Sequence, residues 1–210
     1  MITIASPANL PHIHSFCGLA IMFIVATHCM SIFGWENTPV LRDVLVRVVA
    51  NGTVFYLFIA GYLFDHLSSR YRLRAYWATK IKFVVVPYVL VSIPAIFIFT
   101  FLIQREGLDV AFYDQPQWKQ VFDFLITGKH LAPFWFIPTI IVFYAFSSVL
   151  RVIFSYRKAY LALPLLFLAG ALVPRGNAFQ SFVHFLPIWV LGMACSHFRV
   201  QADLLLQRFF

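Results

Sequence analysis

Long apolar stretches, separated by short polar segments, dominate the pattern of this chain. An α-helix needs roughly 20 predominantly apolar residues to cross the hydrocarbon core of a bilayer. The pattern predicts six such helices, of which the fifth is the shortest. They run approximately over His12–Phe33, Leu45–Phe64, Phe83–Ile103, Pro133–Phe154, Tyr160–Pro174 and Phe179–His197.

The composition agrees with a membrane protein. Hydrophobic residues make up 61% of the chain and charged residues only 11%, whereas a soluble domain is about half apolar and about a quarter charged. We therefore expect an all-α, polytopic transmembrane helix bundle that forms a single domain over residues 1–210. No Lys or Arg precedes the first apolar run, so we expect this span to be retained as a signal anchor.

The distribution of charge predicts the orientation. With the N-terminus in the cytoplasm, the cytoplasmic segments hold ten basic and two acidic residues, and the outer segments hold six of each. Basic residues gather on the cytoplasmic side of membrane proteins. We therefore expect both termini in the cytoplasm of a multi-pass protein of the inner (plasma) membrane. The net charge of +8 then faces membrane lipid, and nucleic acid is not an expected partner.

The longest outer segment, Gln104–Ala132, contains one periodic stretch. Four apolar residues recur there at the spacing i, i+3, i+4 and i+7 of one helix face. They are Trp118, Val121, Phe122 and Leu125. This pattern predicts a short amphipathic helix on the outer membrane surface.

His28 lies inside the first apolar stretch and is the leading candidate for chemistry. An ionisable side chain at membrane depth is costly and marks a functional site by default. A neutral imidazole can take a proton from a hydroxyl group, which is general base catalysis. The structural alternative is a histidine bonded to a carbonyl or hydroxyl of a neighbouring helix. The sequence leaves the two interpretations open.

Five cations follow the second apolar stretch on the predicted cytoplasmic side, and we call this segment the basic loop. Together they could bind the phosphates of a soluble donor. The local sequence favours the topological alternative, in which basic residues gather on the cytoplasmic side and attract anionic lipid. The five are Arg70, Arg72, Arg74, Lys80 and Lys82.

Other polar and aromatic residues give weaker signals. Trp135 lies at the start of the fourth span in an aromatic cluster, which could stack against a sugar ring, although the local sequence favours a membrane-interface belt. No nearby Cys or carboxylate completes a metal site with His12 and His14, so we expect none. The cysteines are three and widely spaced, which does not predict a disulfide framework.

Several stretches together resemble acyltransferase family 3, whose members are multispanning enzymes that move acyl groups onto carbohydrates. The family's first span reads Arg-Gly-(Ile/Leu)-Ala and then His, and here it reads Cys17-Gly18-Leu19-Ala20 and His28. The other matching pieces lie in the same order over nearly the whole chain. They are Asn51-Gly52, Ala60-Gly61-Tyr62-Leu63, Pro87-Tyr88, Phe134-Trp135-Phe136 and Phe185-Leu186 with Leu191-Gly192-Met193.

The resemblance implies an O-acyltransferase that acylates, most often acetylates, a carbohydrate of a surface polysaccharide or its precursor. His28 is then the catalytic histidine, and the basic loop lies where acyl-CoA, the donor substrate, approaches. No tightly bound cofactor is implied. Acceptor-pocket candidates are Asn51, His130 and Trp135.

Three departures from the family pattern support a second interpretation. Cys17 replaces the family's arginine, Ala60 replaces a small hydroxyl residue, and about six spans stand where the family has about ten. The chain then represents an incomplete version of the family domain, or a decayed, non-enzymatic membrane partner. Whether another chain supplies additional helices stays open. A small-molecule transporter is a poorer alternative, because no span has a carboxylate at its centre.

Overall fold

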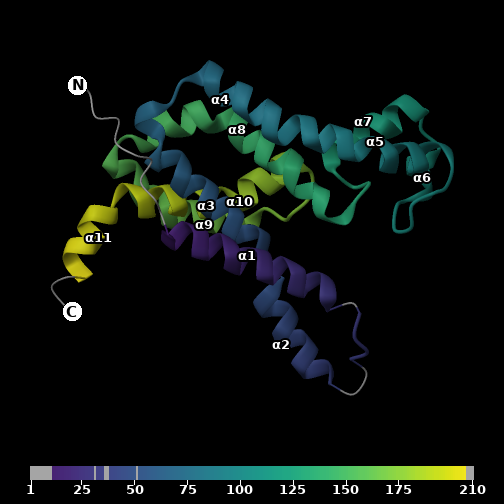
Figure 1. Ribbon diagram of the computed structural model, residues 1–210, viewed down its shortest axis with the longest axis horizontal. Coiled ribbons are helices and arrows are strands. Elements are labelled where there is room, and N and C mark those ends of the chain that lie inside the picture. Colours follow the sequence, from purple (N-terminus) through teal and green to yellow (C-terminus); the bar gives the residue numbers. More distant parts are fainter. Residues whose placement is uncertain (1–10, 31, 36–37, 51, 207–210) are drawn as a thin grey trace. The chain divides into compact units, whose positions relative to one another are not determined.

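The computed structural model describes residues 11–30, 32–35, 38–50 and 52–206. Every regular element in these ranges is a helix, which confirms the predicted all-helical class (Figure 1). The chain forms two compact units, Met1–Asp65 with Ile188–Phe210, and His66–Pro187. Helix α10 (Ala178–His197) gives its first part to the second unit and its last part to the first.

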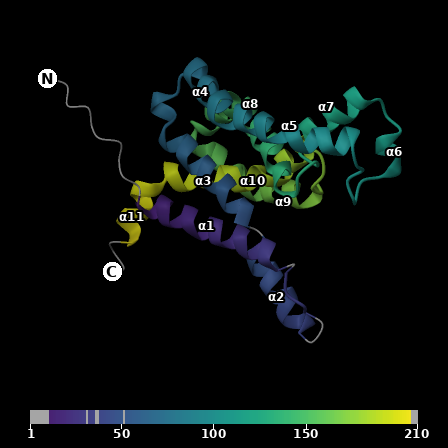
Figure 2. The same cartoon turned by 45° about the vertical axis from the view of Figure 1, so that its right-hand side comes forward.

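The first unit contains α1 (Pro11–Cys29), α2 (Pro39–Val49), α3 (Gly52–His66), the end of α10 and α11 (Arg199–Leu206). A proline opens α2, where its missing N–H costs nothing. The Thr27 hydroxyl lies 2.8 Å from the carbonyl oxygen of Val49 and joins α1 to the end of α2. These two helices lie side by side in both ribbon views (Figures 1 and 2).

Helices α3 and α10 approach each other through two glycines of the first unit. A Cβ atom on Gly61 would overlap the carbonyl oxygen of Trp189, and one on Gly192 would overlap the carbonyl oxygen of Phe58. Small residues let membrane helices bring their backbones into contact. The reciprocal arrangement therefore sets the distance between these two helices.

The second unit begins with η1 (Ser68–Arg70) and one long helical run. This run joins α4 (Leu73–Lys80), the π-helical turn η2 (Ile81–Val85) and α5 (Val86–Phe101). Pro87 has no N–H to continue the α-helical ladder, and the Val86 N–H bonds to Ile81 O at the wider π spacing. The run has 29 residues, or about 43 Å at 1.5 Å per residue, which exceeds the bilayer core of about 30 Å.

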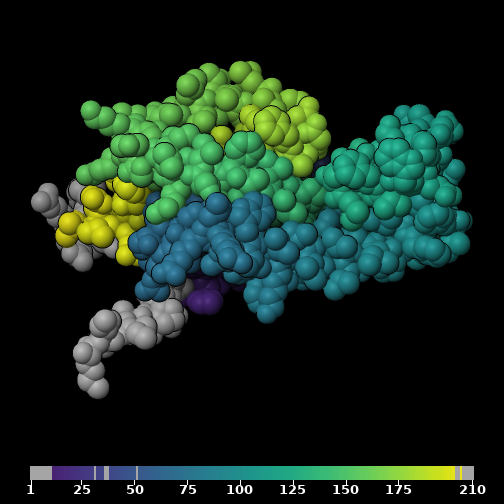
Figure 3. Space-filling view, turned by 90° about the horizontal axis from the view of Figure 1, so that it is seen from above, coloured from purple at the N-terminus to yellow at the C-terminus, as the bar shows by residue number. Residues whose placement is uncertain are grey.

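The rest of the second unit packs on this run. Helix α8 (Phe136–Phe154) lies beside α4, and α7 (Gln117–Thr127) lies along α5 (Figure 3). The Tyr88 hydroxyl on α5 donates to Leu125 O on α7 at 2.7 Å. The remaining elements are α6 (Val110–Tyr113), α7 (Gln117–Thr127), η3 (Ala132–Trp135), α8 (Phe136–Phe154), η4 (Arg157–Ala162), α9 (Leu163–Leu172) and the start of α10.

Helix α7 confirms the helix predicted in the long outer segment, but its packing face differs from the predicted apolar face. Gln120 and Phe124 are its buried residues, whereas Trp118 and Phe122 are 71% and 56% exposed. The face that meets α5 is therefore partly polar, because it carries hydrogen bonds to the preceding loop. Trp118 and Phe122, by contrast, remain on the surface, where a membrane-surface helix would place its apolar side chains.

Five helical segments of the described chain are long and apolar enough to cross a membrane: Pro11–Cys29, Pro39–His66 with α2 and α3 taken together, Leu73–Phe101, Ala132–Phe154 and Ala178–His197. These correspond to five of the six predicted spans. The remaining prediction, the fifth span at Tyr160–Pro174, contains the ten-residue helix α9, which is about 15 Å long. The 3-10 helix η4 precedes α9, so this segment is not one continuous α-helix.

Candidate functional site

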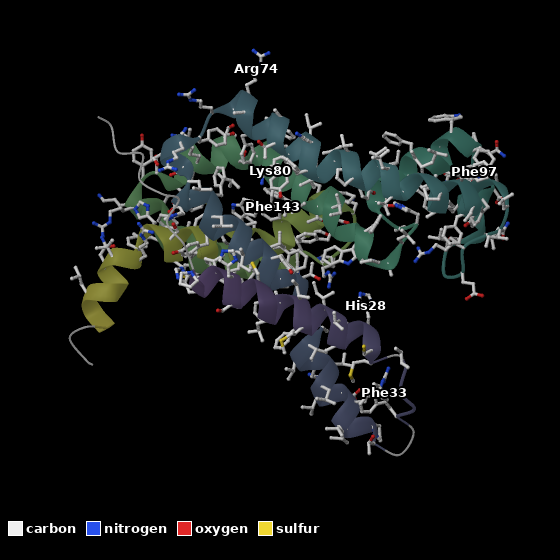
Figure 4. The ribbon with its side chains drawn as sticks, viewed as in Figure 1. His28, Phe33, Arg74, Lys80, Phe97 and Phe143 are labelled. Atoms are coloured by element: carbon white, nitrogen blue, oxygen red, sulfur yellow. The ribbon has the colours of Figure 1, made fainter. Side chains whose placement is uncertain are left out.

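His28 lies in the last turn of α1, in the first unit. His28 is exposed, and its side chain projects from the C-terminal end of the helix (Figure 4). The preceding residue, Thr27, shares its one hydroxyl hydrogen between Phe23 O and Val49 O, both at 2.8 Å. This contact holds the end of α1 against α2 beside His28. Its role as a general base stays a prediction.

Cys17, at the position of the family arginine, lies on the same helix eleven residues earlier. The two residues are thus about 16 Å apart along the axis of α1. Cys17 is half-buried and packs against the cluster of Ile13, Ile59 and Tyr62. The cluster is apolar apart from the tyrosine hydroxyl. All three cysteines, Cys17, Cys29 and Cys195, are free thiols.

The predicted basic loop, in the second unit, does not form a single cationic cluster. Arg70, Arg72 and Arg74 are exposed on η1 and the start of α4. In Figure 4, Arg74 projects away from the ribbon, whereas Lys80 points toward α8. The structure thus leaves three arginines together on the surface and separates Lys80 from them.

Lys80 lies among aromatic rings of α4 and α8. Its Nζ is 4.5 Å from the Tyr144 ring centroid and 5.3 Å from that of Tyr76. Such cation–π contacts gain strength when they are shielded from water. Lys82, by contrast, is exposed, with its Nζ 5.2 Å from the Phe83 ring.

A polar cluster beside Lys80 was not predicted from the sequence. The Tyr71 hydroxyl lies 2.9 Å from Ser148 Oγ and 3.3 Å from Ser147 Oγ, and the Arg151 guanidinium lies 5.2 Å from the Tyr71 ring. The sequence did carry a signal for it. Tyr144, Ser147, Ser148 and Arg151 recur at the three- and four-residue spacing of one helix face.

Asn51, one of the three acceptor-pocket candidates, lies outside the described residues. The second, His130, is fully buried. Its Nδ1 lies 3.0 Å from Phe124 O and its Nε2 lies 2.8 Å from Ser92 Oγ. Through these bonds His130 ties the loop after α7 to α5. This gives the residue a structural role, and its place in an acceptor pocket stays a prediction.

Burial sets the protonation state of His130. Desolvation lowers its pKa from 6.5, the nearby Arg105 charge lowers it further, and the bond to Phe124 O opposes them. The neutral ring donates through Nδ1 to Phe124 O and accepts at Nε2. Ser92 has one hydroxyl hydrogen for either His130 Nε2 or Tyr88 O, the latter at 2.7 Å.

Trp135, the third candidate, is held in an aromatic and cationic stack. Its ring stacks on that of Phe185 with centroids 6.0 Å apart. The Arg175 guanidinium lies 4.3 Å from the Trp135 centroid and 5.3 Å from that of Phe185. Arg175 lies 40 residues after Trp135 in the chain, so the sequence gives no signal of this contact. The geometry offers a flat aromatic and guanidinium surface next to η3.

The candidates therefore fall into groups. His28 and Cys17 belong to the first unit, while the basic loop, His130 and Trp135 belong to the second. Within the second unit, Arg74 and Ser92, the partner of His130, lie on one helical run, 18 residues or about 27 Å apart. Arg74 and the contact between Ser92 and His130 therefore lie well separated along the α4–α5 axis. Among the described residues, no three His, Cys, Asp or Glu side chains gather as metal ligands.

Comparison with known families gives one match. The family model Acyl_transf_3, described as an acyltransferase domain, matches residues 18–209. The matched range includes His28 and the basic loop and passes through both units. Comparison with curated proteins and with solved structures gave no match.

Proposed function

Because the chain belongs to acyltransferase family 3, we propose that it is an integral membrane O-acyltransferase that moves an acyl group from acyl-CoA to a carbohydrate hydroxyl. Acetyl is the expected acyl group, and a surface polysaccharide or its precursor, at the inner (plasma) membrane, is the expected acceptor. The observation that carries this proposal is the family match over residues 18–209, together with His28 on the helix that bears the family's Gly-Leu-Ala segment.

The reaction assigns His28 the role of general base. The acceptor hydroxyl oxygen attacks the thioester carbonyl carbon, and a new C–O bond forms. The C–S bond then breaks, and CoA leaves as a thiolate. His28 takes the proton of the attacking hydroxyl and returns it to the thiolate sulfur, so the products are an ester and free CoA. Base catalysis of this kind contributes typically about 10²- to 10⁴-fold in rate.

The exposed arginines of the basic loop are the proposed donor contacts. Acyl-CoA is a polyanion, and guanidinium groups bind phosphates through paired hydrogen bonds. Arg70, Arg72 and Arg74 are all exposed and so accessible to a soluble donor. Lys82 is exposed as well, whereas Lys80 contacts aromatic rings. We therefore assign the first phosphate contacts to the three arginines.

An acyl transfer assay on membranes that contain the chain tests this function. With labelled acetyl-CoA as donor, the wild-type chain forms acetylated carbohydrate, and His28→Ala lowers the rate by about 10²-fold or more. His14→Ala is the matched control, because His14 is an exposed histidine on the same helix, and its rate stays at the wild-type level. Equal turnover in wild type and His28→Ala would exclude His28 as the base.

A second function, that of a non-catalytic membrane partner, is favoured by the position of Cys17. A thiol that packs on Ile13, Ile59 and Tyr62 cannot bind phosphate as the family arginine would. The variant Cys17→Arg discriminates between the two functions. Activity that appears only in Cys17→Arg indicates a decayed enzyme, and activity of the wild-type chain excludes this second function.

A further inference from the structure

A polar cavity of about 500 Å³ lies at the C-terminal end of α5, and its lining includes neither His130 nor Trp135. The end of α5 forms one wall, and the segment from α6 to α7 forms the other. All of its lining belongs to the second unit. Its polar lining residues are Thr100, Gln104, Tyr113, Gln115, Gln117 and Gln120.

Gln120 shows that this cavity is more than a surface depression. Its side chain is only 4% exposed. Its amide nitrogen donates to Gln115 O at 2.8 Å and to Tyr113 O at 3.3 Å. Both bonds use the nitrogen, so the side chain is fixed with its oxygen Oε1 buried and without a hydrogen-bond partner within the described chain.

Two further oxygens of the lining share this state. Thr100 Oγ1 and Gln115 Oε1 are also buried and lack a hydrogen-bond partner within the described residues. A buried polar group without a partner costs about 1–3 kcal/mol. Three such oxygens around one cavity favour a ligand that brings several hydrogen-bond donors.

The lining also restricts the charge of this ligand. The residues that line the cavity include no Asp, Glu, Lys or Arg. An ammonium group would find no counter-charge there, and a phosphate would face carbonyl oxygens that repel it. The hydroxyl of Tyr113, which accepts the Arg105 N–H at 2.7 Å, adds an aromatic ring to the polar wall. An uncharged molecule with several hydroxyl groups supplies the hydrogen-bond donors and brings no charge into the cavity.

The cavity and the basic loop lie at opposite ends of the same helical run. Arg74 and Thr100 are 26 residues apart on Leu73–Phe101, or about 39 Å at 1.5 Å per residue. This distance exceeds the bilayer core of about 30 Å. We propose that the cavity is a binding subsite for the sugar ring of the acceptor, on the membrane face opposite the donor contacts. The proposal rests on the acyl-transfer function proposed above.

A binding measurement without any donor tests the subsite. The full chain in lipid nanodiscs is titrated with the methyl glycosides of glucose, galactose, mannose and N-acetylglucosamine, and binding is followed by saturation-transfer NMR. At least one glycoside binds the wild-type chain. Thr100→Val, which removes only an unpartnered hydroxyl and keeps the side-chain shape, weakens that binding about tenfold, the effect of one buried hydrogen bond.

Thr79→Val is the matched control. Thr79 lies near the other end of the same helical run, and its hydroxyl donates to Ala75 O at 2.9 Å. The Thr79→Val variant should bind the glycoside with the same affinity as the wild-type chain. The subsite is overturned if no glycoside binds the wild-type chain, or if Thr100→Val and the wild-type chain bind equally. Gln120→Leu gives a second measurement, in which glycoside binding is lost while size-exclusion chromatography confirms a folded chain.

An acetyl-transfer assay on the same samples separates the two proposals. A chain that binds a glycoside through Thr100 but never acetylates it contradicts the catalytic function and leaves the subsite intact. A chain that acetylates a glycoside with the same KM in wild type and Thr100→Val contradicts the subsite and leaves the catalytic function intact.

Discussion

The ammonium nitrogen of Lys80 lies 4.5 Å from the centroid of the Tyr144 ring, between α4 and α8. This contact and the one to Tyr76 give Lys80 a structural role that the exposed arginines nearby lack. A shielded cation–π contact contributes up to about 2 kcal/mol. Lys80→Gln should therefore lower the thermal unfolding midpoint, measured in detergent by tryptophan fluorescence. Lys82→Gln, which changes an exposed cation, should leave it unchanged, and equal shifts in both variants would contradict the assignment.

The three arginines of the basic loop should show the opposite behaviour. Because they are exposed, replacing Arg70, Arg72 and Arg74 together by Gln should raise the KM for acetyl-CoA about tenfold or more without changing the unfolding midpoint. The KM of this variant should also depend less on salt, since ionic screening acts on charges that have been removed. Steady-state kinetics at low and high ionic strength provide the measurement. An unchanged KM for acetyl-CoA at low salt would show that the three arginines do not bind the donor.

The close contact between α3 and α10 predicts a strong effect of a single methyl group. Gly61→Ala or Gly192→Ala places Cβ against a backbone carbonyl of the facing helix, and overpacking of this kind costs typically about 1–3 kcal/mol. The unfolding midpoint should fall in both variants. Gly18→Ala is the matched control, because a Cβ there meets nothing within 4 Å. It should be neutral or slightly stabilising, since alanine favours helix over glycine. Similar midpoints in all three variants would show that the two helices do not meet in this way.

The buried His130 predicts a dependence of stability on pH. Its pKa is lowered in the folded chain from 6.5, so below that pH the unfolded chain binds protons more readily than the folded chain. Proton binding to the unfolded chain therefore lowers the free energy of unfolding as the pH falls below about 6.5. Above that pH, His130 is neutral in both states and has no such effect. Unfolding midpoints between about pH 5 and 8 should therefore decline on the acid side for the wild-type chain. They should decline less for His130→Gln, and identical pH profiles would contradict the prediction.

The stack of Arg175 on Trp135 and Phe185 predicts a small, specific loss of stability. Arg175→Ala removes a guanidinium 4.3 Å from the Trp135 ring and should cost about 0.5–1 kcal/mol. Arg42→Ala is the control, because Arg42 makes one ion pair, with Asp43 at 3.8 Å, in which both side chains are more than half exposed. Such pairs contribute about 0–1 kcal/mol, with many near zero. If Arg175→Ala and Arg42→Ala lower the free energy of unfolding in denaturant equally, the stack contributes no more than an ordinary surface charge.

The sequence alone determined the class of this protein and its membership of a family. Apolar runs of membrane length specify helices, because a chain in lipid must satisfy its backbone hydrogen bonds internally. The helix at Gln117–Thr127 was predicted from the spacing of its apolar residues, which is also a local property of the sequence. The order of the motifs around His28, Gly61 and Trp135 sufficed to predict the family, which the match over residues 18–209 confirmed.

Only the tertiary structure decided what each side chain contacts. Lys80 and Arg74 are equivalent in sequence pattern, yet Lys80 points to Tyr144 and Arg74 points away from the ribbon (Figure 4). Gln120 lies outside the predicted apolar face of Trp118, Val121, Phe122 and Leu125, yet it is buried at the polar cavity. The hydrogen bonds by which His130 connects α5 and α7 were likewise visible only in the structure. Helical periodicity shows which residues share a face, but a face becomes buried, and its polar groups become paired, only through partners far away in the chain.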